Sequence, residues 1–199
     1  MKGRIYISGA FRNVSRTRCG GGVGWIDNDP HFWTTPPTWG ICRSDLRKLV
    51  RPGDYVFFVL PKNADAPQMI YAYLKVKRKV DHLAAYHRPE LRRKRMRPSA
   101  PGRPNGNIIV DARGRYNPLD GNPDHRKRFR RIREHYVVGD ARESEFLSRK
   151  RIERLAPRFA DELRRVFRTN KRRVIDVISR WGRVMNEEQV DDLSSWLRG

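Results

Sequence analysis

The chain has 199 residues, and its 44 Lys and Arg against 22 Asp and Glu give a formal net charge of +22. Such an excess works against compaction through self-repulsion, so it indicates a polyanionic partner, with nucleic acid ahead of an acidic membrane or protein. No apolar run has the length of a membrane span or of a signal peptide, which predicts a cytoplasmic protein with reduced thiols and no membrane partner.

The first part of the chain predicts three strands and one short helix. A strand over 1–10 precedes an irregular segment rich in Gly, Pro and Trp. A helix over 45–50 is predicted with Ser44 as its cap, and apolar strands over 55–60 and 69–80 follow. Alternation in the last strand predicts a solvated basic face, made of Tyr71, Tyr73, Lys75, Lys77 and Lys79.

The middle of the chain predicts two more strands, over 107–111 and 136–138. A short helical piece at 83–86 precedes a segment rich in Pro and Arg. Because the strands are short and helices are few in this part, the pattern indicates a small mixed sheet or barrel.

After residue 140 the pattern changes to helices. Ser148 is a predicted cap for a helix to residue 156, and Pro157 suits the first turn of the next helix. A further helix is predicted over 172–181, and Asn186 with Gln189 forms a capping box for the last one. The apolar stripes of these helices are expected to face the core, including the stripe of Val174, Ile178 and Trp181.

The strongest charge excess lies in residues 88–133, which hold 15 Lys and Arg and 4 Asp and Glu. Gly and Pro interrupt this segment, which argues against a packed face. It predicts either a solvated loop or a phosphate clamp whose binding weakens steeply with salt. The arginines expected to contact phosphate are Arg92, Arg93, Arg95, Arg97, Arg113, Arg115, Arg126, Arg128, Arg130 and Arg131.

Aromatic residues gather in the irregular segment near the N-terminus, where Trp25, Phe32, Trp33 and Trp39 lie close in sequence. They could plug one end of a barrel or form a stacking site for a base, since aromatic side chains stack on bases. A second candidate for base contact is the turn that ends in Tyr116 and Asn117, for which a plain turn is the alternative.

Catalytic signals are weak. The sequence has no Walker A loop, no HExxH, no zinc-deaminase signature and no Cys or His spacing typical of zinc, so no metal and no cofactor are predicted. Cys42, Lys75 and Asp111 are the weak candidates for a catalytic role. The last two helices resemble a helix-turn-helix, but phosphates would repel the second helix, because it carries Glu187, Glu188, Asp191 and Asp192.

Several runs resemble the PUA-like superfamily, which includes the EVE, ASCH and YTH groups. These runs begin at Trp39 and at Met69, with the Gly53-Asp54 pair ahead of an apolar strand. Later runs, from Gly106 to Pro118 and from Tyr136 to Asp140, resemble one branch more closely, the nucleotide modification associated domain, type two. The first 38 residues depart from that pattern.

The resemblance implies a small β-barrel with flanking helices, and an association with modified bases in DNA, often in phage or anti-phage settings. Related domains bind a flipped base in an aromatic pocket. With Trp33 from the aromatic segment, that role is assigned here to Trp39, Gly40, Ile41, Tyr71, Tyr116 and Asn117.

The sequence therefore predicts an α+β protein with a PUA-like barrel domain over 1–140 and a helical extension over 141–199. The expected function is recognition of a modified, flipped base, with the Arg-rich segment on the phosphates and with DNA favoured over RNA. A modification or defence enzyme is a possible partner. Two alternatives stay open: an enzyme that modifies or hydrolyses a nucleobase or nucleoside on this scaffold, and a general RNA-binding protein.

Overall fold

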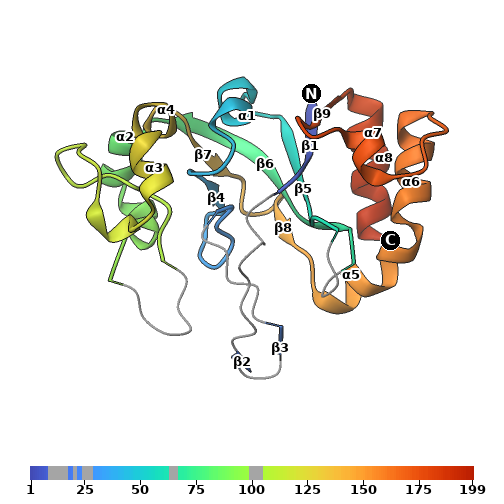
Figure 1. Ribbon diagram of the computed structural model, residues 1–199, viewed down its shortest axis with the longest axis horizontal. Coiled ribbons are helices and arrows are strands. Elements are labelled where there is room, and N and C mark those ends of the chain that lie inside the picture. Colours follow the sequence, from blue (N-terminus) through green and yellow to red (C-terminus); the bar gives the residue numbers. More distant parts are fainter. Residues whose placement is uncertain (9–17, 20–21, 24–28, 63–66, 99–104) are drawn as a thin grey trace. The chain divides into compact units, whose positions relative to one another are not determined.

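The computed structural model describes residues 1–8, 18–19, 22–23, 29–62, 67–98 and 105–199, and Trp25 lies outside them. The fold is α+β, as the sequence predicts, with a mixed seven-stranded sheet in the order β4-β7-β6-β5-β1-β9 and with β8 beside β6 (Figure 1). The chain forms two compact units. The first comprises Met1–Arg12, Gly53–Lys75 and Glu145–Gly199, and the second comprises Asn13–Pro52 and Val76–Ser144.

The strands of the first unit surround β5. β1 runs parallel to β5, whereas β6 runs antiparallel to β5 and β9 runs antiparallel to β1. The short strand β8 pairs with β6. The bounds are β1 Gly3–Ile7, β5 Tyr55–Val59, β6 Ile70–Val80, β8 Glu145–Phe146 and β9 Arg183–Met185.

Five helical elements complete the first unit. Ser148 caps the first of them as predicted, and Asn186 with Gln189 forms the predicted capping box of the last. The third packs against the fourth and the fifth. The elements are α5 Arg149–Leu155, η4 Ala156–Arg158, α6 Phe159–Phe167, α7 Val174–Ile178 and α8 Glu187–Arg198.

The second unit contains the end of β6, which pairs with β7, and β7 in turn pairs with β4. A two-stranded hairpin and several short helices accompany them. The strands are β2 Arg18–Cys19, β3 Gly22–Val23, β4 Thr38–Trp39 and β7 Tyr136–Gly139. The helices are α1 Ser44–Leu49, α2 His82–His87, η2 Pro89–Lys94, η3 Pro118–Asp120, α3 Pro123–Lys127 and α4 Phe129–Arg133.

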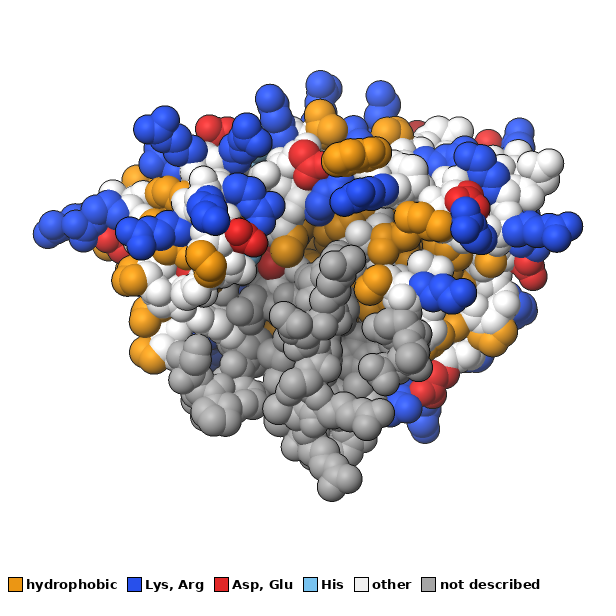
Figure 2. All heavy atoms as spheres, in the orientation of Figure 1, with side chains coloured by type: hydrophobic (Ala, Val, Ile, Leu, Met, Phe, Trp, Pro, Cys, Tyr) orange, Lys and Arg blue, Asp and Glu red, His pale blue; other side chains and the backbone are white. Residues whose placement is uncertain are grey.

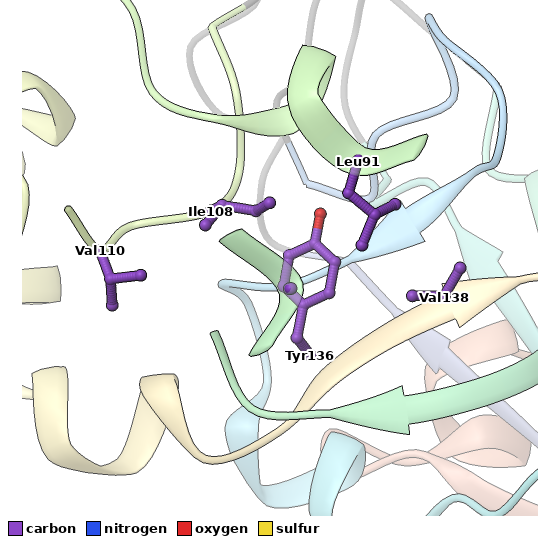
Figure 3. Close-up of a cluster of buried hydrophobic side chains, with 6 residues drawn as sticks. Leu91, Ile108, Val110, Tyr136 and Val138 are labelled. Atoms are coloured by element: carbon purple, nitrogen blue, oxygen red, sulfur yellow. The ribbon is translucent and has the colours of Figure 1, made fainter. Parts of the chain in front are cut away.

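The core of the second unit is built around Tyr136, whose ring lies among aliphatic side chains from separate segments (Figure 3). Leu91 comes from η2, Ile108 and Val110 from the segment after it, and Val138 from β7. All of these side chains are at most 1% exposed. Burial of large apolar side chains is the main stabilising contribution available to so small a unit.

The sheet is open and does not close into the predicted barrel. The outermost strands, β4 and β9, each pair with one neighbour among the described strands. Closure would require the two outermost strands to pair with each other, and strands of two and three residues offer few hydrogen bonds for this.

The predicted strand over 107–111 is also absent. Ile108 and Val110 make only single bridges, to Arg95 and Tyr116. These partners lie just after a 3-10 helix and in a tight turn, so no extended neighbour is present to form a ladder.

The predicted solvated face of β6 is wrong for the first half of the strand. Tyr71 and Tyr73 are 1% and 6% exposed. Tyr71 packs against Phe58 and Phe146, with ring centroids 6.1 and 5.8 Å away. Aromatic packing therefore covers residues that the alternation pattern assigned to solvent.

Three helical predictions need correction. The predicted cap of the first helix is wrong, because α1 begins at Ser44 itself, with Arg43 at the cap position and no side-chain cap hydrogen bond. The helix predicted over 172–181 ends at Ile178, and Trp181 is 72% exposed instead of facing the core. The residues from 123 to 133, which the sequence marks only as basic, form α3 and α4. Among the described helices, none has both the length and the apolar character that a membrane span requires.

Candidate nucleic-acid interface

The second unit contains a buried carboxylate, Asp29, which accepts hydrogen bonds from three successive backbone N–H groups. Gly40 N lies 2.6 Å from Oδ1 and Ile41 N lies 2.9 Å from Oδ2, and Cys42 N also donates to Oδ2. Burial raises the pKa of Asp29 above its ordinary value, and the charge of Arg47 and these hydrogen bonds offset only part of that rise. Asp29 therefore fixes the backbone directly after β4.

Asn107 extends the contacts of this carboxylate. Its Nδ2 donates to Asp29 Oδ1 at 3.0 Å, and its Oδ1 accepts from Tyr136 Oη at 2.6 Å and from Thr38 Oγ1 at 3.2 Å. We call Asp29, Thr38, Asn107 and Tyr136 the Asp29 network. The preceding residue must be glycine, because a Cβ at position 106 would lie 2.2 Å from backbone carbonyl oxygens.

Two buried side chains, the guanidinium of Arg47 and the imidazole of His82, form hydrogen bonds with the same backbone segment that Asp29 holds. Arg47, which is 0% exposed, donates to the carbonyl oxygens of Ile41, Cys42 and Ile132 at 3.0, 3.1 and 3.2 Å. His82 Nδ1 accepts from a backbone N–H and its Nε2 lies 2.8 Å from Gly40 O, so the ring is neutral with its proton on Nε2. Burial lowers the pKa of His82 to about 3.

Lys94 is also 0% exposed and anchors the neighbouring loop. Its Nζ lies 2.9 Å from His31 Nδ1 and donates to the carbonyl oxygens of His31 and Thr34 at 3.1 and 2.6 Å. Trp33 lies between these two anchored residues and is 40% exposed. The loop therefore exposes the Trp33 indole while hydrogen bonds from the buried Lys94 side chain hold the backbone on both sides of it.

Burial lowers the pKa of Lys94 from its ordinary value of 10.5 to about 7. The unfolded chain keeps this proton to higher pH than the folded protein, so the free energy of unfolding should rise with pH between these two values. Lys94→Met should flatten the rise. Denaturant unfolding of both proteins at several pH values between about 6.5 and 9 checks this, and equal pH slopes would contradict it.

The predicted base-pocket residues do not form one set. Trp39 and Ile41 are 0% and 5% exposed and belong to the interior of the second unit. Gly40 has no room for a side chain, since a Cβ would lie 2.5 Å from the Tyr136 ring. Tyr71 belongs to the first unit.

Tyr116 and Asn117 lie in the second unit and are half-buried. Tyr116 donates to Asp120 Oδ2 at 2.6 Å, and burial together with that carboxylate raises its pKa to about 12. Asn117 caps η3 by accepting from Leu119 N at 3.1 Å. Each thus has a local structural partner, and Trp33 is the exposed member of the predicted pocket set.

The basic surface is concentrated on α3 and α4. Residues 123–133 hold six Lys and Arg and one Asp, and none of the six forms an ion pair with a described residue. Lys and Arg side chains project over the region of α2, α3 and α4 in Figure 2. We call this set the α3–α4 surface; its exposed members are Arg126, Lys127, Arg128, Arg130, Arg131 and Arg133.

Other predicted phosphate contacts differ in their surroundings. Arg92, Arg93 and Arg113 are exposed. Arg95 is half-buried, stacks over the Tyr86 ring at 4.2 Å and donates to the carbonyl of the same residue at 2.6 and 3.0 Å, which gives it a structural role.

Two more of these arginines are exposed but engaged. Arg97 donates to Arg93 O at 2.7 Å, a contact that leaves its charge uncompensated. Arg115 pairs with Asp111 at 2.9 Å, which offsets its charge.

The weak catalytic candidates are not brought together. Asp111 accepts from the N–H groups of Arg113 and Arg115, and the backbone N–H of Arg115 is the main cause of its lowered pKa. The backbone N–H of Cys42 donates to Asp29, and its carbonyl oxygen accepts from Arg47. Lys75 lies in the first unit, 5.5 Å from the Tyr55 ring centroid. Within the described ranges, no cluster of three or more His, Cys, Asp or Glu could hold a metal ion.

Sequence reasoning missed the residues that organise this region. Asp29, His31 and Asn107 have no local motif, and Lys94 is one of several cations in a basic run. The dipeptides Asp29-Pro30 and Gly106-Asn107 indicate turns, but they do not indicate that Asp29 and Asn107 are buried partners. Compared with known proteins, the chain matches no family model, no curated protein and no solved structure.

Proposed function

We propose that the second unit binds nucleic acid, with the α3–α4 surface on the phosphate backbone and Trp33 stacked on a base. One observation carries the proposal: six cations in eleven residues face solvent without an ion pair among the described residues. Exposed, unneutralised arginines grip phosphates bidentately and release counterions on binding.

The first unit provides the contrast. Six of its described arginines pair with carboxylates, which offsets their charges locally, whereas Arg154, Arg158, Arg172 and Arg198 are exposed and form no ion pair with a described residue. The pairs are Arg149–Glu153, Arg151–Glu145, Arg164–Asp161, Arg165–Glu162, Arg165–Asp192, Arg168–Glu188 and Arg173–Asp176. The α3–α4 surface differs from the first unit in density, because its six cations lie within eleven residues and none of them forms an ion pair with a described residue.

Trp33 supplies the base contact in this proposal. An indole that is 40% exposed on an anchored loop loses little conformational freedom when it stacks on a base. Base–aromatic stacking contributes about 1–3 kcal/mol per base. Trp39 is no alternative platform, because its side chain is 0% exposed.

The resemblance of the sequence to the nucleotide modification associated domain, type two, supports a modified base in DNA as the preferred ligand. It also supports a PUA-like relationship for the sheet and a modification or defence enzyme as the partner. The preference for a substituted base would come from added apolar contact with an indole.

Fluorescence anisotropy with matched oligonucleotides, plain or carrying a panel of modified bases, tests the proposal at about 50 and 200 mM salt. We expect binding that weakens steeply with salt, and a preference for one modified base that persists at the higher salt. Equal binding to every oligonucleotide would reject the preference for a modified base and would indicate a general nucleic-acid-binding protein. Absence of salt-dependent binding would reject the proposal.

Trp33→Ala should reduce the preference for the modified base and leave the salt dependence unchanged, because the phosphate contacts remain. The loss should be about 1–3 kcal/mol of binding free energy, the range for one stacked base. Trp33→Phe is the matched control and should retain much of the preference. If Trp33→Ala bound all oligonucleotides like the unaltered protein, the base contact would lie elsewhere.

A further inference from the structure

Trp181 is the most exposed large apolar side chain among the described residues, at 72%. It lies between α7, which ends at Ile178, and β9, which begins at Arg183, in the first unit; Figure 1 labels both elements. The turn is closed by Gly182 N donating to Ser179 O at 3.3 Å, Ser179 Oγ donating to Gly182 O at 3.0 Å, and Trp181 N donating to Ser179 Oγ at 3.2 Å. The indole is therefore held outward on a fixed backbone.

The backbone explains why Trp181 leaves the apolar stripe that the sequence predicts. Ser179 has a φ of 68°, which ends α7 at Ile178, and Gly182 has a φ of 86°. Val174 and Ile178 stay buried as predicted, at 7% and 0% exposed. The positive φ of a residue other than glycine costs free energy, which suggests a use for the outward position of the indole.

The surroundings of Trp181 are basic. Residues 168–183 hold six Lys and Arg and one Asp. Arg168 and Arg173 pair with carboxylates, whereas Lys171 and Arg172 are exposed and form no ion pair with a described residue. Arg180, which precedes Trp181 in the sequence, is also exposed. An aromatic side chain flanked by cations is the arrangement that single-stranded nucleic acid recognises.

We propose that the α7–β9 turn is a second nucleic-acid contact, specific for single strands, in which the Trp181 indole stacks on an unpaired base and Lys171 and Arg172 contact phosphates. Duplex bases already stack on each other and offer no free face, so this contact favours a single strand. The site uses no residue of the α3–α4 surface, and it would hold if the proposed function of that surface failed.

A protein partner is the competing occupant, because Ile175 and Val184 are also exposed, at 40% and 53%. The charge favours a polyanion, because residues 168–183 hold six Lys and Arg against one Asp and such a basic cluster attracts phosphates. The two occupants give different outcomes in the experiment below.

Anisotropy titrations of the full chain with a labelled oligo-dT strand and with a hairpin duplex test the inference. We expect Trp181→Ala to weaken single-strand binding by about tenfold or more and to leave duplex binding unchanged, with Trp181→Phe retaining most of the affinity. The double variant Lys171→Ala, Arg172→Ala should lower the slope of log affinity against log salt by about 1.4 for the single strand. Photocrosslinking to a bromouracil-containing strand should label the peptide that carries Trp181.

Unchanged single-strand binding in Trp181→Ala would overturn the inference, as would an equal loss for strand and duplex. The inference would also be overturned if Trp181→Ala altered only self-association, measured by sedimentation. Trp181 is exposed, so the melting temperature should not change, and this checks the fold of the variants. A loss confined to Trp33→Ala and to variants of the α3–α4 surface would support the proposed function and reject this second contact; the reverse pattern would do the opposite.

Discussion

Replacing Asp29 by alanine should lower the free energy of unfolding by about 4 kcal/mol or more, which is at the upper end for a single substitution. The change removes the acceptor for the N–H groups of Gly40, Ile41 and Cys42 and for the amide of Asn107. A buried donor without an acceptor costs about 1–3 kcal/mol, and four are created at once. Guanidinium unfolding followed by circular dichroism measures the loss.

Two variants control this experiment. Asp29→Asn keeps one acceptor oxygen but turns an NH2 group toward backbone donors, so it should fall between the unaltered protein and Asp29→Ala. Asp45→Ala removes a carboxylate that pairs with Arg43 at the surface, and it should cost at most about 1 kcal/mol. If Asp29→Ala were no less stable than Asp45→Ala, the Asp29 network would not have the structural role described above.

The double variant Arg130→Ala, Arg131→Ala should bind nucleic acid more weakly at every sequence. Both side chains are exposed on α4 and form no ion pair with a described residue. Each lost phosphate contact should lower the slope of log affinity against log salt by about 1, so the pair should lower it by about 2. Titrations of one duplex at four salt concentrations give the slope.

The matched control also removes two positive charges, but from arginines that form ion pairs with carboxylates. Arg149 and Arg164 are arginines of the first unit whose charges are offset by Glu153 and Asp161. Their double alanine variant should bind with nearly the unaltered salt slope, because no phosphate contact is lost. Equal effects of the two double variants would mean that net charge alone governs binding, without an interface on α4.

The two experiments distinguish residues that stabilise the fold from residues that contact nucleic acid. The Asp29 network fixes the backbone at residues 40–42, and Lys94 separately holds the loop that carries Trp33. Loss of the network should therefore appear first as loss of stability, whereas loss of α4 cations should appear as weaker binding at unchanged stability.

The sequence by itself determined the features that depend on neighbouring residues. Ser148 and Asn186 cap their helices as predicted, since a cap uses a side chain and a backbone N–H two or three residues apart. The apolar runs near β5 and β6 became strands, because continuous apolar segments must be buried. The charge excess on residues 123–133 is likewise a property of composition, although its helical form was not predicted.

Only the tertiary structure decided which polar residues are buried. Lys94 has the same neighbours in sequence as several exposed arginines, and its burial depends on acceptors at His31 and Thr34, about sixty residues away. Asp29 is a partner of Asn107 across 78 residues. Trp181 faces outward although it was predicted in an apolar stripe, because of the backbone turn at Ser179. Trp39, for which a buried plug and a base-stacking site were both open, is buried beside the pairing of β4 with β7. Such partners are distant in sequence, and no local pattern encodes them.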